Sequence, residues 1–157
     1  VEARSLRLGA IRITERFFGN GSASRAPSAK AVERCRTFLR AALSGVAREL
    51  GGHRPQLAVG SSGTIMALAT MVVAARGADV RQMNGLSFSA EELRSVVATL
   101  LGTSGDGRRR LRGLDERRAD IIVGGALELD QSFSTSALSA LVIGAIWYLF
   151  VHRHMRK

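Results

Sequence analysis

The sequence predicts an α/β fold, and three observations point to it. A short apolar run at residues 56–60 lies between Pro55 and a Gly/Ser turn, which is typical of a buried strand. Apolar residues recur at helical spacing over 32–50, 65–73 and 93–101. Because strand-like and helix-like segments alternate, the pattern favours α/β over a helical bundle or an all-β sandwich.

The N-terminal third is expected to hold a strand and then a long helix. Residues 5–13 alternate apolar and polar side chains, with a slip at Gly9-Ala10, and predict a strand followed by a short helical turn from Thr14. Pro27 suits the first turn of the long helix, and Gly51-Gly52 suits its end. The apolar stripe of that helix consists of Val32, Cys35, Leu39, Leu43, Val46 and Leu50. Since Cys35 lies on the stripe, we expect a buried, inert thiol.

The strand at residues 56–60 leads into the turn Ser61-Ser62-Gly63-Thr64 and then into a helix. A strand, a Gly/Ser turn and a helix N-terminus in this order place unpaired backbone N–H groups and hydroxyls at the carboxyl edge of a sheet. Both features favour a bound phosphate. A tight turn that needs glycine for backbone reasons alone is equally compatible with the pattern.

The second half of the chain begins with a helix whose start is signalled clearly. Ser89-Ala90-Glu91-Glu92 forms a capping box, and Gly102 ends the helix. Residues 103–113 then predict a flexible loop with four arginines in five positions, either solvated or in contact with a polyanion. Asp115 can cap a further helix. Within it, Gly124-Gly125 would weaken the middle or allow another backbone to approach closely. Residues 137–143 fit a last strand.

The charge of the chain points to an anionic partner. The formal net charge is +10, and of the 23 basic residues only Lys30 and Lys157 are not arginine. The planar guanidinium binds phosphate oxygens bidentately, although a genome-wide bias toward arginine gives the same composition. Aromatic residues make up 5% and do not interleave with the arginines, so we expect no DNA partner and no stacking on bases. The lone cysteine excludes an intramolecular disulfide and favours the cytoplasm.

Three stretches of the chain share their pattern with one known family. Residues 5–17 read SLRLGAIRITERF, residues 58–65 read AVGSSGTI, and residues 113–122 read GLDERRADII. In this order they resemble the S-L-x-x-G-x-x-R-L-T-E, A-x-G-[TS]-[SA]-G-T and G-L-x-x-x-R-A-D-x-I stretches of the Ppx/GppA phosphatase family. These proteins are exopolyphosphatases and guanosine pentaphosphate phosphohydrolases of the actin-like superfamily. The resemblance covers residues 5 to about 143.

The resemblance implies that residues 1–143 form the second lobe of a two-lobed phosphohydrolase. That lobe would be actin-like (ribonuclease H-like), with a mixed sheet and flanking helices, and the whole enzyme would hydrolyse terminal phosphoanhydrides with Mg²⁺. The family's catalytic glutamate lies in the N-terminal lobe, so we expect no catalytic residue and no metal ligand here, and no activity of this chain alone. The family often has arginine where this chain has Met66. The substrate-binding residues that the resemblance implies are Gly60, Ser61, Ser62, Gly63, Thr64, Arg117 and Arg118.

Several alternatives stay open at this point. The substrate is polyphosphate or guanosine pentaphosphate (pppGpp), and the partner is the N-terminal lobe or a second copy of the chain. The alternative function is a non-catalytic lobe that binds polyphosphate or an alarmone. Residues 144–157 depart from the family and are apolar and then basic, which fits a frameshifted end or a short membrane anchor over 133–152. His152 and His154 are expected to belong to a charged tail and not to a metal site.

Overall fold

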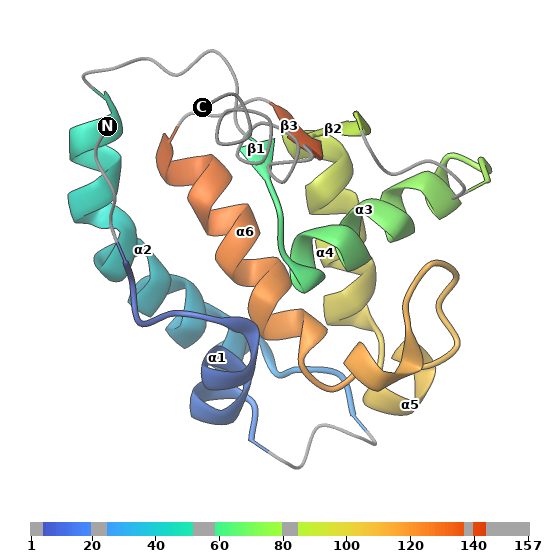
Figure 1. Cartoon of the computed structure of the whole chain (residues 1–157). Helices are drawn as coiled ribbons and strands as arrows, with labels where there is room; N and C mark the ends of the chain where they lie inside the picture. The colour runs from blue at the N-terminus through green and yellow to red at the C-terminus, as the bar shows by residue number, and fades with distance from the viewer. Residues whose placement is uncertain (1–4, 20–24, 52–58, 80–84, 137–139, 144–157) are drawn as a thin grey trace, which may run out of the picture.

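The computed structural model describes residues 5–19, 25–51, 59–79, 85–136 and 140–143 (Figure 1). Within these ranges the chain forms helices, a 3₁₀ turn and three short strands. The helices are α1 (Ala10–Phe17), α2 (Ala29–Gly51), α3 (Gly63–Ala75), α4 (Ala90–Gly102), α5 (Gly105–Arg108) and α6 (Ile122–Ser136). The 3₁₀ turn, η1, is Glu116–Arg118, and the strands are β1 (Val59–Gly60), β2 (Ser87–Ser89) and β3 (Ala140–Ile143).

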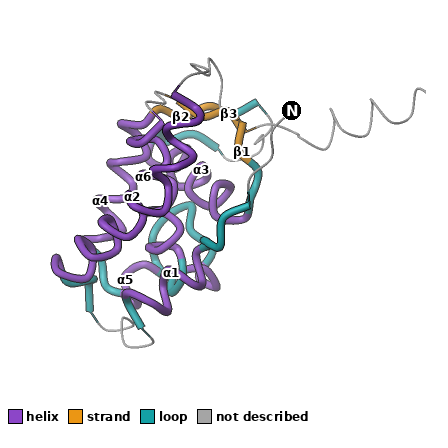
Figure 2. Tube along the Cα trace, turned by 90° about the vertical axis from the view of Figure 1, so that its left-hand side faces the viewer, coloured by secondary structure: helices purple, strands orange, loops and turns teal. Residues whose placement is uncertain are grey.

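The three strands form one small mixed sheet in the order β1-β3-β2. β1 runs parallel to β3 with Val59 opposite Val142, and β2 runs antiparallel to β3 with Phe88 opposite Leu141. Figure 2 shows the strands gathered at one end of the helices. The predicted α/β class and mixed sheet are confirmed. Of the strands expected at 56–60 and 137–143, the described residues form β1 and β3, and residues 56–58 and 137–139 lie outside the described ranges. β2 was not anticipated, because SFS is too short to show a period.

Helix α6 lies at the centre of the lobe and packs against α1, α2, α3 and α4 (Figure 1). Its inward side chains Ile122, Leu127 and Phe133 are almost fully buried. Phe133 stacks on Phe88 of β2 with 6.2 Å between ring centroids, which ties the sheet to the helices. The described part of the chain therefore has one continuous core, organised around α6.

The expected strand over residues 5–13 is wrong, because residues 10–17 form α1. On a helix, Ala10, Ile13, Thr14 and Phe17 share one side, and Ile13 and Thr14 are buried. Ile11, an inward position of the expected strand, is 57% exposed. Residues 10–17 form a helix and not a strand because α1 can pack closely on α6 at Gly124, which has no side chain. A Cβ there would lie 2.8 Å from the Ala10 carbonyl oxygen, so only glycine allows this approach. The alternative of a close backbone approach at Gly124-Gly125 is thus confirmed.

The long helix is confirmed as α2, which begins two residues after Pro27 and ends at Gly51. Cys35, Leu39 and Leu43 of the expected stripe are buried. Burial raises the pKa of the Cys35 thiol to about 11, so the thiol stays protonated at neutral pH. The expectation of a buried cysteine is therefore confirmed, and its inertness stays a prediction.

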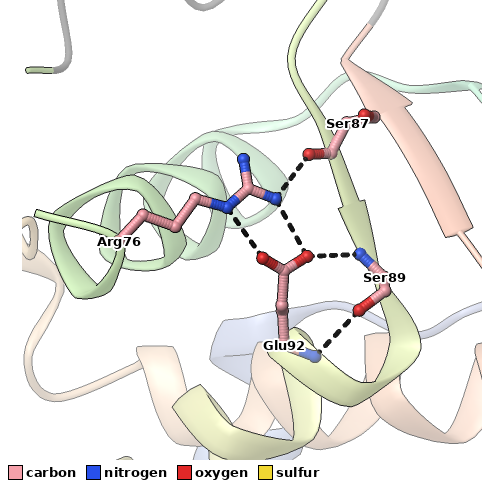
Figure 3. Close-up of polar contacts among 4 residues, drawn as sticks. All are labelled: Arg76, Ser87, Ser89 and Glu92. Carbon is pink, nitrogen blue, oxygen red and sulfur yellow. Dashed lines mark hydrogen bonds and ion pairs between the residues drawn. The ribbon is translucent and has the colours of Figure 1, made fainter. Parts of the chain in front are cut away.

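The capping box of α4 is present and extends into a small polar network (Figure 3). The Ser89 hydroxyl accepts from the backbone N–H of Glu92, and the Glu92 carboxylate accepts from the N–H of Ser89. Arg76, just after α3, donates to both Glu92 oxygens and to the Ser87 carbonyl. Hydrogen bonds from Arg76 lower the pKa of Glu92 to about 2. This network joins the end of α3 to the start of α4.

The helix expected to start at Asp115 is wrong in its extent. Asp115 does cap, because its carboxylate accepts from the N–H of Arg117, but it caps only the 3₁₀ turn η1. A new helix, α6, begins at Ile122 after a change of direction. The tail at 144–157, including His152 and His154, lies outside the described residues.

Candidate functional site

The Gly/Ser turn after β1 opens directly onto the N-terminus of α3. Ser62 is the N-cap of α3, and its hydroxyl accepts a hydrogen bond of 3.1 Å from the N–H of Ile65. The backbone N–H groups of Gly63 and Thr64 belong to the first turn and have no partner within the helix. α3 has no acidic residue in this turn, so the positive end of its dipole is not neutralised locally.

Arg118 lies against this turn although it is 55 residues further along the chain. A Cβ on Gly63 would lie 2.5 Å from Nη2 of Arg118 and 2.9 Å from its Cζ, so the guanidinium packs directly over Gly63. Arg118 is half-buried, and it is the last residue of η1. The first-turn amides of α3 and the Arg118 guanidinium thus lie close together, which is a combination that binds phosphate.

The segment before Arg118 is fixed by a buried arginine. Arg108 is 1% exposed and donates to the carbonyl oxygens of Ala119, at 3.0 Å, and Thr103, at 2.7 Å. Arg109 pairs with Asp120 at 3.0 Å. The expectation of a flexible loop with solvated arginines is therefore wrong for Arg108. Its guanidinium donates to two backbone carbonyl oxygens and not to water. The hydrogen bond to Ala119 holds the residue next to Arg118.

Two adjoining hollows meet at the turn. The first, the arginine groove, has a volume of about 430 Å³ and is lined by Gly9, Arg12, Ser62, Gly63, Thr64 and Arg118 together with neighbouring apolar residues. The second, the Glu128 pocket, has a volume of about 380 Å³ and is lined on its polar side by Ser62, Thr64, Glu128 and Ser132. Gly9, Ala10, Ser62 and Thr64 line both, so the two hollows adjoin at the start of α1 and the start of α3.

The structure brings only some of the expected site residues together. Ser62, Gly63, Thr64 and Arg118 line the arginine groove, whereas Gly60, Ser61 and Arg117 are not among its lining residues. Arg117 points to solvent, with 85% of its side chain exposed, and pairs with Asp115 at 2.8 Å. Hydrogen bonds from Arg117 lower the pKa of Asp115 to about 2. Met66, where the family often has arginine, packs against the core.

Sequence reasoning missed Arg12 and Glu128 as residues of the site. Arg12 was assigned to a strand, although it stands in the first of the three family stretches, two residues after Ala10. Once residues 10–17 are a helix, its first turn brings Gly9 and Arg12 to the groove. Glu128 is the only acidic residue between Asp120 and Asp130, in an otherwise apolar stretch. That break in an apolar face was the signal that could have found it.

Within the described residues, no group of three or more His, Cys, Asp and Glu side chains lies together where it could hold a metal ion. What the arrangement can do by itself is bind and orient an anion through amides, hydroxyls and guanidinium groups.

A family model for the Ppx/GppA phosphatase family matches residues 1–144. The chain belongs to the Ppx/GppA phosphatase family. The resemblance found in the three sequence stretches is therefore confirmed. The matched range includes α1, the Gly/Ser turn, η1 and β3, so all residues of the candidate site lie within the part of the chain that matches the family.

Solved structures of the Ppx/GppA family agree with this fold. The chain superposes on a family member from Aquifex aeolicus with a TM-score of 0.76 at 21% identity, covering 100% of this chain and 51% of that one. A second structure, of an Aquifex aeolicus Ppx/GppA enzyme, gives 0.76 at 25% identity over 91% and 45% of the two chains. An exopolyphosphatase from Cytophaga hutchinsonii gives 0.77 at 17% identity over 95% and 49%. Among the curated proteins, no sequence matches.

The chain spans about half the length of these similar structures. Their actin-like fold confirms the predicted fold class. The assignment of residues 1–143 to one particular lobe stays a prediction. In the part of the chain that the structure describes, we find no helix with the length and apolarity to cross a bilayer. Residues 140–143 of the proposed anchor form strand β3.

Proposed function

We propose that this chain is the half of an exopolyphosphatase-like phosphohydrolase that holds the phosphate chain of the substrate. The observation that carries the proposal is the position of Arg118 over Gly63, at the open N-terminus of α3. Membership of a phosphatase family makes phosphate the natural anion for that position. Arg12 adds a second guanidinium to the same groove. Inorganic polyphosphate and guanosine pentaphosphate both present the required phosphate chain, and both stay alternatives.

The roles within the proposed site follow from the chemistry of each group. The N–H groups of Gly63 and Thr64 donate to phosphate oxygens along the axis of α3, where the helix dipole favours negative charge. Arg118 donates from its planar fork to two oxygens at once. The groove lies between α1 and α3 and is open to solvent, so a linear chain of several phosphates can enter it lengthwise. Hydrolysis needs a water-activating carboxylate that we propose the N-terminal lobe supplies.

Binding of tripolyphosphate to this chain, measured by titration calorimetry without metal, tests the proposal. We expect Arg118→Ala to weaken binding about tenfold, since one charge-assisted contact to phosphate is lost. Arg117→Ala is the matched control, because Arg117 is the adjacent arginine and is held by Asp115. It should change the affinity less than about twofold. Equal loss in the two variants would mean attraction to net charge alone and would contradict the proposed site.

A binding lobe without turnover is the second candidate, and the absence of a carboxylate cluster among the described residues favours it for the chain alone. Incubation with Mg²⁺ and long-chain polyphosphate separates the two. We expect no release of inorganic phosphate from this chain and release when the N-terminal lobe is added. Release by the chain alone that a chelator abolishes would show that the described half is itself catalytic. A partner lobe and a second copy of this chain are distinguished by sedimentation of the chain with and without that lobe.

A further inference from the structure

Glu128 is a half-buried carboxyl group in the wall of the proposed phosphate site. It projects from α6 into the Glu128 pocket, whose other polar lining groups are the hydroxyls of Ser62, Thr64 and Ser132. Ser62 and Thr64 also line the arginine groove, so an anion long enough to extend beyond the turn reaches the carboxyl group. A carboxylate is the group least suited to a place beside a polyanion, because like charges repel.

The surroundings of Glu128 favour its neutral form. Burial raises the pKa of this carboxyl, and the hydrogen bond from the backbone N–H of Gly9 lowers it by less. Among the described ion pairs, none includes Glu128. A polyphosphate bound in the adjoining groove would raise the pKa further, since it adds negative charge nearby.

Among the described charged and titratable groups, none forms an ion pair with Glu128. From α2, the Cys35 thiol interacts with Glu128 and is protonated at neutral pH, because burial raises its pKa to about 11. On α6 itself, Asp130 pairs with Arg36 of α2 at 3.6 Å. α3 contributes only Ser62, Thr64 and Ile65 to the pocket. Arg12 of α1 and Arg118 of η1 line the arginine groove on the other side of the turn.

A protonated carboxyl group in this position adds a donor to the hydroxyls of Ser62 and Thr64 that line the pocket. The hydroxyl of Ser132 already donates to the Glu128 carbonyl oxygen at 2.8 Å. The Ser62 hydroxyl accepts from Ile65 as the N-cap of α3, and its proton is directed away from that bond. A neutral carboxylic acid can donate one O–H to a phosphate oxygen, whereas the ionised form can only accept.

We propose that Glu128 is a ligand-binding residue of this site, which in its protonated form donates a hydrogen bond to an oxygen of a bound phosphate chain. The inference rests on the proposed function of the arginine groove. Binding of the polyanion then takes up a proton at Glu128, and affinity falls as the pH rises and the free carboxyl ionises. Glu128 thus adds a contribution to phosphate binding that grows as the pH falls, in addition to the pH-independent attraction of Arg118.

The test is the affinity of tripolyphosphate for the full chain across about pH 5 to about pH 8, measured by calorimetry with a chelator present. Glu128→Gln keeps the shape of the side chain, and its amide N–H replaces the acid O–H as donor. We expect the wild-type affinity to fall about tenfold more than that of Glu128→Gln over this range. The titration of tripolyphosphate itself is common to both proteins and cancels in the ratio. Repeating the titration in two buffers of different ionisation enthalpy should show additional proton uptake only for wild type.

Two further variants keep the test decisive. Glu91→Gln removes an equal charge from an exposed position in the first turn of α4, and it should keep the wild-type pH profile. If the Glu128→Gln variant does not fold, Glu128→Leu replaces it, because an apolar side chain suits a half-buried position. This variant should bind tripolyphosphate weakly and without the pH dependence of wild type. Identical profiles for wild type and Glu128→Gln would overturn the role of Glu128 and leave the arginine groove intact. No binding by wild type at any pH would overturn both.

Discussion

The N-termini of α3 and α4 begin alike and end up with different roles. Each helix has 13 residues and a serine N-cap, Ser62 in α3 and Ser89 in α4, whose hydroxyl accepts from the third residue of the helix. At α4 the third residue is Glu92, which returns a hydrogen bond to Ser89 and pairs with Arg76 (Figure 3). At α3 the third residue is the apolar Ile65, and a glycine follows the cap.

This difference decides what each end can bind. At α4, the protein supplies its own anion, because the Glu92 carboxylate occupies the positive end of the helix. At α3, Gly63 admits the Arg118 guanidinium instead, so positive charge is added to positive charge. Such an end is electrostatically incomplete until an anion arrives. The N-terminus of α4 therefore joins two elements of the lobe, and the N-terminus of α3 is suited to bind a ligand.

The packing of α1 against α6 at Gly124 is the most sensitive to change. In Gly124→Ala the new methyl group would lie 2.8 Å from the Ala10 carbonyl oxygen and 2.9 Å from the Thr14 nitrogen, so α1 must shift from α6. We expect the free energy of unfolding to fall by about 2–3 kcal/mol. Urea denaturation measures the change. Gly45→Ala is the matched control, since no atom lies within 4 Å of a Cβ there and an exposed helical alanine should stabilise by about 0.5–1 kcal/mol.

Gly63→Ala should abolish the difference between the two helix ends without unfolding the lobe. The three atoms nearest to a Cβ at this position all belong to the flexible end of the Arg118 side chain, which can move away. We expect the affinity for tripolyphosphate to fall about fivefold, because the guanidinium leaves the turn. The midpoint of urea unfolding should not fall, since alanine is the better helix former. Unchanged affinity would show that Arg118 contributes nothing from this place.

Glu92→Gln should weaken the α4 end in a pH-dependent way. The hydrogen bonds from Arg76 depress the pKa of Glu92 from 4.5 to about 2, so the carboxylate stabilises the folded lobe above its unfolded pKa. We expect a loss of about 1 kcal/mol at neutral pH, because the pair is about one-third exposed and solvent screens it. The gap between wild type and variant should close as pH falls from about 4.5 to about 2. A gap that stays constant over this range would contradict the ion pair, and Glu91→Gln serves as the control.

The two caps should also differ when each serine is replaced. Ser89→Ala removes the acceptor for the Glu92 N–H from a reciprocal capping box, and Ser62→Ala removes a single cap hydrogen bond. We expect both to lower the free energy of unfolding by about 1 kcal/mol, with Ser89→Ala more costly by about 0.5 kcal/mol. Chemical denaturation of the two variants in parallel measures this difference. A larger loss for Ser62→Ala would mean that the α3 end is the better satisfied of the two.

Several features of the lobe could be predicted from local sequence. The stripe through Cys35 and Leu39 predicts α2, the box from Ser89 to Glu92 predicts the start of α4, and the run before Gly60 predicts β1. These signals act over a few residues, through helical period and capping hydrogen bonds. The order of the three family stretches was equally local information. It placed Ser62, Gly63 and Thr64 in the candidate site before any contact was known.

Tertiary structure decided the features that depend on contacts between distant segments. Alternation in residues 5–13 is compatible with a strand, and α1 forms because Gly124 lets its backbone approach α6. Nothing in the segment around Arg108 indicates that its guanidinium is buried, since the carbonyl of Ala119 that it binds is fixed only in the folded chain. The same holds for Arg118 over Gly63 and for Glu128 beside Thr64. A sequence records each residue's preferences, whereas the packing of the whole lobe decides which separate segments become partners.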